Sequence, residues 1–170
     1  AFRYLRKTGQ GRRSVWSICW ARDSQSIYDQ DFDNIYQLSF DGTELRKWSV
    51  NSMFPKGALS SSSGMAISPD GNVLVIDVEM DEETANSIGS DDGPPTAIWT
   101  YNLATGKAER ITKPGLMAWH PCWLNDNEIL FSTQARKEKT PSLYKLSIPP
   151  KQAARLLQNA NDPVAAAPFP

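Results

Sequence analysis

The sequence predicts an all-β fold built from a four-stranded unit that occurs three times. Each copy opens with a strand, an Asp-containing turn and a second strand, and Asp23, Asp70 and Asp126 occupy equivalent places in the three turns. The copies follow one another at intervals of roughly 50 residues, the length of a propeller blade. A third strand rich in β-branched and aromatic residues follows each turn. These observations predict a segment of a β-propeller with about three four-stranded antiparallel blades.

Each expected strand has a counterpart in all three copies. In the second copy the first two strands are joined by Ser-Pro-Asp-Gly, in which Pro presets φ and Gly accepts a positive φ. The third strands are expected at residues 35–38, 98–101 and 143–146, and the fourth at 45–48, 109–112 and 154–157. Residues 151–158 also have the composition of a short helix, but the repeat favours a strand. An Arg recurs at one place in the fourth strands and is interpreted as structural, with its stem across the blade; the residues are Arg46, Arg110 and Arg155.

The blades are expected at about residues 14–52, 62–113 and 116–158. Residues 1–8 resemble the last strand of a preceding blade, and residues 164–170 resemble the first strand of a following one. Three blades with two stray strands cannot close a ring, so sheet edges and apolar faces would stay open. We therefore expect either the rest of a longer propeller or a second copy of this chain to complete the ring.

The second copy carries the most specific motif, in residues 68–74, 98–107 and 110–112. These residues resemble the TolB-type (WD-repeat-like) propeller repeat, which typically reads Trp-Ser-Pro-Asp-Gly, then Ile-Tyr-x-x-Asp-Leu, Gly-Gly and Arg-Leu-Thr. The other copies depart from it in the turn, with Arg22-Asp23-Ser24 and Asn125-Asp126-Asn127. The resemblance implies a non-enzymatic scaffold for protein–protein interaction at the bacterial envelope, periplasmic or extracellular, without a cofactor.

Two other functions remain open. TolB-like blades also resemble the propeller that gates prolyl oligopeptidase-type serine peptidases, whose catalytic domain would lie outside these residues. A Gly-x-Ser-x-Gly elbow beyond Pro170 would favour that alternative. A polysaccharide-active propeller would need clustered His, Arg and acidic residues, whereas the chain has one His.

Composition excludes several classes of protein. The formal net charge of −1 argues against a nucleic-acid binder driven by bulk charge. No apolar run approaches the length of a membrane-spanning helix. Cys19 and Cys122 occupy the same place in blades one and three, too far apart to bridge, and are expected to be small buried side chains.

Three groups of residues are candidate sites, and no catalytic residue is predicted. Asp29, Asp31 and Asp33 alternate like the first half of a calcium loop, but Gly and Glu are missing at the sixth and twelfth positions, and a hydrated turn is the simpler interpretation. A protein partner could contact Trp119, an aromatic residue where a loop meets a strand, and the neighbouring His120. The third group is an acidic insertion in blade two, with the candidates Asp81, Glu82, Glu83, Asp91 and Asp92.

Overall fold

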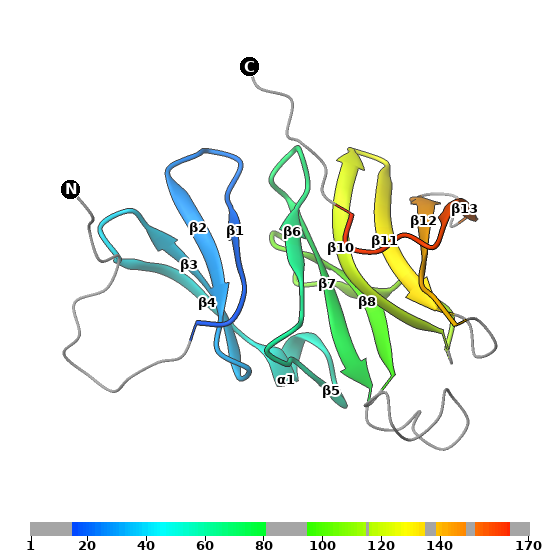
Figure 1. Cartoon of the computed structure of the whole chain (residues 1–170). Coiled ribbons are helices and arrows are strands. Elements are labelled where there is room, and N and C mark those ends of the chain that lie inside the picture. The colour runs from blue at the N-terminus through cyan, green and yellow to red at the C-terminus, as the bar shows by residue number, and fades with distance from the viewer. Residues whose placement is uncertain (1–14, 81–94, 115, 135–138, 149–151, 164–170) are drawn as a thin grey trace.

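The predicted all-β fold is confirmed: three antiparallel sheets, two of four strands and one of five, follow one another along the chain, side by side like blades of a propeller (Figure 1). The computed structural model describes residues 15–80, 95–114, 116–134, 139–148 and 152–163. The stray strands expected at 1–8 and 164–170 lie outside these residues. Among the described residues, no helix combines the length and the hydropathy needed to cross a membrane.

Blade one is a meander in which each strand pairs with the next. Its turns are built by side chains as the sequence suggests: Asp23 Oδ1 accepts hydrogen bonds from the backbone N–H groups of Gln25 at 2.8 Å and Ser26 at 3.1 Å. Gly42, with φ of 85°, serves the turn between the last two strands. The strands are β1 (Ile18–Trp20), β2 (Ser26–Gln30), β3 (Asn34–Ser39) and β4 (Glu44–Ser49), and the short helix α1 (Val50–Met53) leads out of the blade.

Blade two contains a fifth strand that the repeat does not predict. The first strand of the expected meander, β6, pairs only with residues 74–76, in the first half of the longer β7. The remaining edge of β7 pairs with β5, through Gly57 with Met80 and Ala58 with Glu79. The strands are β5 (Gly57–Ala58), β6 (Met65–Ile67), β7 (Val73–Met80), β8 (Thr96–Asn102) and β9 (Ala108–Arg110).

Blade three is again a four-stranded meander. Its last strand decides between the short helix and the strand that the sequence allowed for residues 151–158. Residues 152–158 form a strand that pairs with β12. The first strand shows a register shift between Trp119 and Cys122, and His120 within it has φ of 51°. The strands are β10 (Met117–Asn125), β11 (Glu128–Gln134), β12 (Ser142–Ser147) and β13 (Gln152–Gln158).

The core is divided into layers between consecutive blades. One cluster joins blades one and two and includes Phe54, Leu74 and Ile76, with Cys19 packed against it. Burial raises the pKa of the Cys19 thiol to about 12, but Cys19 and Cys122 are both half-buried and not the fully buried side chains that the sequence predicts. The other cluster joins blades two and three and includes Val75 and Phe131. Successive residues of β7 thus serve different layers, since side chains alternate across a strand.

The outward faces of the two end blades carry exposed apolar side chains. On β1, Cys19 points to the core, whereas Ile18 and Trp20 are 63% and 64% exposed. On blade three, Leu157 is 56% exposed. In a propeller these are the faces that a neighbouring blade covers, as expected of an incomplete ring.

Candidate functional site

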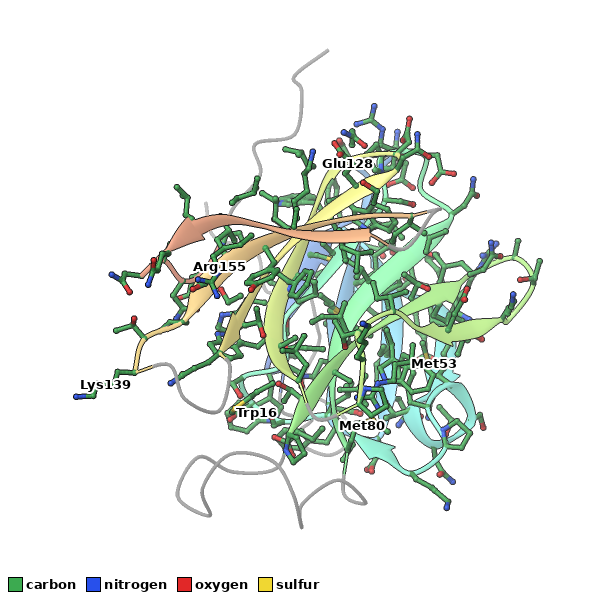
Figure 2. The ribbon with its side chains drawn as sticks, turned by 90° about the vertical axis from the view of Figure 1, so that its right-hand side faces the viewer. Trp16, Met53, Met80, Glu128, Lys139 and Arg155 are labelled. Carbon is green, nitrogen blue, oxygen red and sulfur yellow. The ribbon has the colours of Figure 1, made fainter. Side chains whose placement is uncertain are left out.

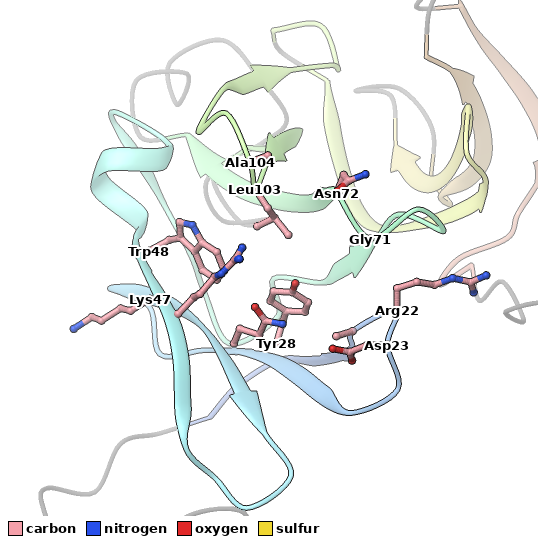
Figure 3. A pocket seen from close by; sticks show the side chains of 12 residues that line it. Arg22, Asp23, Tyr28, Lys47, Trp48, Gly71, Asn72, Leu103 and Ala104 are labelled. Atoms are coloured by element: carbon pink, nitrogen blue, oxygen red, sulfur yellow. The ribbon is translucent and has the colours of Figure 1, made fainter.

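A groove of about 840 Å³ lies between blades one and two (Figure 3). Its floor and one wall come from β2, β3 and β4 of blade one. The other wall comes from two turns of blade two, at Gly71 and Asn72 and at Leu103 and Ala104. The groove is therefore a product of blade packing, and no single blade could form it.

Strand register places three polar side chains in one row on the groove side of blade one. Tyr28 pairs with Gln37, and Gln37 pairs with Arg46. Paired residues on adjacent strands point to the same face of a sheet, so the phenol, the amide and the guanidinium line up across the blade. All three residues line the groove.

Tyr28 anchors the row from within the core. The residue is only 4% exposed, and its ring lies 6.2 Å from that of Trp48 at an interplanar angle of 35°. Burial raises the pKa of the Tyr28 phenol; the neighbouring thiol of Cys19 acts in the same direction, while the charge of Arg46 opposes it. The Tyr28 hydroxyl makes no hydrogen bond to any other described residue. The raised pKa keeps the phenol a protonated donor on the lining of the groove.

Arg46 differs from the arginines that the repeat aligns with it. Arg110 Nε donates to the carbonyl of Thr112 at 3.0 Å, and Arg155 lies 5.6 Å from the ring centre of Tyr144. Within the described part of the chain, the guanidinium of Arg46 has no hydrogen bond or ion pair. Arg46 is thus a cation on the groove wall that the fold itself does not use.

Arg46 is placed differently because the pairing of β3 with β4 is shifted by one residue relative to the other blades. The predicted equivalence of the three arginines is therefore wrong for Arg46. Arg155 pairs with Tyr144, the counterpart of Tyr36 in blade one. The residue that pairs with Tyr36 is Lys47, whose Nζ lies 5.4 Å from the ring centre. Lys47 therefore fills the structural place. It is one of the residues that line the groove, but the end of its side chain points away from it (Figure 3), and Arg46 lies on the opposite face of the strand.

The rim of the groove depends on a close contact between the blades. Gly71 has φ of 79°, and a Cβ there would lie 3.2 Å from Cβ of Arg22. Asp23, the acidic residue among those that line the groove, is engaged in its own turn, since its Oδ1 also accepts a hydrogen bond from the Ser26 hydroxyl at 3.2 Å. The lining thus has more positive than negative charge.

A second polar cluster joins β7 of blade two to β10 of blade three. Asp77 on β7 is 2% exposed; its Oδ2 accepts a hydrogen bond from the backbone N–H of His120 at 3.1 Å, and its Oδ1 accepts one from the N–H of Gly64. Burial raises the pKa of Asp77 to about 7, although both hydrogen bonds act in the opposite direction. This carboxyl holds the unusual backbone of His120 in place.

Trp119 and His120, expected to contact a partner protein, contact this chain's own segment after β13. Trp119 Nε1 donates to Asn161 Oδ1 at 2.9 Å, and His120 Nδ1 pairs with Asp162 Oδ1. His120 Nε2 lies 3.2 Å from the carbonyl oxygen of Ser62, an atom that can only accept. The imidazole therefore faces a carbonyl instead of a serine hydroxyl, which is not the arrangement that activates a nucleophile.

The calcium candidates do not converge in this structure. Asp31 accepts hydrogen bonds from the N–H of Asn34 at 3.0 Å and the hydroxyl of Tyr36 at 2.9 Å, as a turn residue does. Asp29 is buried within β2, whereas Asp33 is exposed. Across the described residues, no group of three or more His, Cys, Asp or Glu side chains could hold a metal ion.

The acidic candidates Asp81, Glu82, Glu83, Asp91 and Asp92 lie outside the described residues. The sequence alone did not predict the row of Tyr28, Gln37 and Arg46 in the groove, nor the role of Asp77. Tyr28 and Gln37 could have been assigned to one face of the blade, because successive side chains along a strand point to opposite faces. Arg46 could not, because its place depends on the register shift between β3 and β4.

Comparison with known proteins identifies the class of fold. No protein-family model and no curated protein matches the sequence. Among solved structures, TolB from Acinetobacter baumannii is similar over 85% of this chain and 32% of its own, at 16% identity and a TM-score of 0.54. The WD40 repeats of RRP9 are similar over 94% of this chain and 42% of their own, at 15% identity and a TM-score of 0.60.

An oligogalacturonate lyase from Vibrio parahaemolyticus is also similar, over 81% of this chain and 38% of its own, at 10% identity and a TM-score of 0.60. This chain spans less than half the length of each of these structures. At such identities the similarity shows a propeller-like fold and nothing finer, since one fold hosts many functions. The chain is thus a partial β-propeller.

Proposed function

We propose that this chain is part of a propeller that acts as a non-enzymatic scaffold, and that a protein partner binds in the groove between blades one and two. The observation that carries the proposal is Arg46. Its repeat counterparts Arg110 and Arg155 are engaged within their own blades, whereas Arg46 faces the groove without a partner among the described residues.

The composition of the groove supports binding of a protein. Arg and Tyr beside a Trp are the side chains most enriched at the energetic centres of protein interfaces. The Tyr28 ring is held by Trp48 and by the core behind it, so little side-chain freedom would be lost on binding. A pre-formed groove on a rigid scaffold is suited to a short segment of a partner.

An unbiased peptide library displayed on phage tests the proposal. We expect selection on the native protein to yield peptides whose binding falls at least tenfold for Arg46→Glu. The matched control is Lys139→Glu, which changes the net charge equally at an exposed residue on the edge of blade three (Figure 2). Peptides that bind both variants as well as the wild type, or a selection without specific binders, would overturn the groove as the contact site.

A further inference from the structure

The charges of the groove define what can fill it. Arg46 is a cation on the groove wall, and Arg22 stands at the rim, where its stem packs beside Gly71. The carboxylate of Asp23 is occupied by hydrogen bonds from its own turn. A ligand that carries negative charge is therefore favoured over a neutral or basic one, because a guanidinium binds carboxylates through paired hydrogen bonds.

The other two residues of the row, Tyr28 and Gln37, determine how a ligand bound to Arg46 would be oriented. The Tyr28 hydroxyl is a second donor on the same lining, and the charge of Arg46 opposes the rise in the pKa of its phenol. Gln37 Nε2 already donates to the Ser26 hydroxyl at 2.9 Å, which leaves the amide oxygen as an acceptor. The row thus presents donors for a carboxylate and, beside them, an acceptor for an N–H group.

The two aromatic residues of the groove, Tyr28 and Trp48, pack on each other. The ring of Trp48 is tilted at 35° to that of Tyr28 and packs against the core between blades one and two, so part of its surface is already covered. Leu103, which also packs against that core, lines the opposite wall. The remaining apolar surface fits a small aliphatic side chain next to the carboxylate.

We infer that the groove binds an acidic segment of a partner protein, with an Asp or Glu carboxylate held by Arg46 and Tyr28 and a backbone N–H held by Gln37. This inference rests on the proposed function and specifies its ligand. The segment would place a small apolar residue against Trp48 and Leu103.

The peptides selected on the native protein provide the probe. We expect those that depend on Arg46 to share an Asp or Glu beside an aliphatic residue. Changing that acid to its amide should weaken binding to the wild type at least tenfold, measured by fluorescence polarisation. It should have little further effect on Arg46→Gln, because the two changes remove the same interaction. Tyr28→Phe should weaken binding severalfold, and Lys139→Gln should not.

The outcomes separate this inference from the proposed function. Groove-dependent peptides without a shared acid would overturn the acidic ligand while the protein-binding groove stands. A selection without groove-dependent peptides would overturn both. Binding of oligogalacturonate that depends on Arg46, together with no acidic peptides, would assign the groove to a polysaccharide instead. Circular dichroism and thermal unfolding of Arg46→Gln and Tyr28→Phe verify that each variant is folded, and the cycle with Arg46→Gln tests the acidic ligand without any change at Tyr28.

Discussion

Asp77 on blade two accepts a hydrogen bond of 3.1 Å from the backbone N–H of His120 on blade three. The carboxyl also accepts the N–H of Gly64, so a single buried side chain connects three segments. His120 has φ of 51°, a backbone conformation that is uncommon for a residue other than Gly and that needs support from its surroundings. Asp77 supplies that support at the junction of two blades.

Stability should depend on pH through Asp77. Burial raises the pKa of Asp77 from 3.8 to about 7, so between these values the folded state binds more protons than the unfolded state. The free energy of unfolding should therefore be highest at low pH for this group and fall as the pH rises to about 7. Above about pH 5 the carboxyls of Asp70 and Glu128, whose pKa values are lowered, are already ionised and change nothing further.

Urea unfolding measured between pH 5 and 8 checks this dependence. The decrease should be on the order of a few kcal/mol. In Asp77→Asn the decrease should largely disappear, because the amide does not titrate. An equal pH dependence in the variant would show that another group is responsible.

Substitution of Lys47 should affect the stability of the fold, whereas substitution of Arg46 should affect binding and leave stability nearly unchanged. Lys47→Ala removes a cation from the ring of Tyr36 and should lower the free energy of unfolding by about 0.5–1 kcal/mol. Arg46→Ala should change it by less than about 0.5 kcal/mol, because the guanidinium makes no contact that the fold uses. Chemical denaturation of both variants measures the difference. The reverse order would contradict the register that we describe for β3 and β4.

Gly57 should not tolerate a side chain. A Cβ at this position would lie 2.5 Å from Cγ1 of Val78 and 3.2 Å from Cβ of Phe54, both of which are fully buried. Gly57→Ala should therefore lower the unfolding free energy by about 1–3 kcal/mol, as overpacking does. Thermal unfolding measures this loss of stability, and Ser62→Ala, at an exposed residue, serves as the control. An unchanged midpoint would mean that β5 moves away from β7 without cost.

Phe54 should be the most costly single truncation in the core between blades one and two. It is fully buried and packs edge-to-face on Trp99 at 5.7 Å and on Tyr101 at 6.4 Å. Phe54→Ala should cost about 3–5 kcal/mol in unfolding free energy. Leu45→Ala, at a half-exposed side chain, should cost far less. Similar values for the two would place Phe54 outside the core.

The repeated Asp turns and the alternating strands predict the blades well, because each depends on residues close together in the chain. Asp23 and Gly42 shape their turns by local hydrogen bonding and backbone freedom. The groove could not be predicted in the same way. Whether Arg46 or Lys47 meets Tyr36 is decided by the pairing of β3 with β4, and one shift in register exchanges the two faces. The pairing of β5 with β7 likewise depends on how far β7 extends beyond β6.

The division of the core into layers between consecutive blades has a consequence for how the molecule opens. β7 contributes Leu74 and Ile76 to one layer and Val75 to the other, so it is held from both sides, whereas each end blade is held by one layer only. Units that contact only their neighbours come apart from the ends inward. The backbone amides of β7 should therefore exchange their hydrogens with solvent most slowly, and those of β1 and β13 should exchange first.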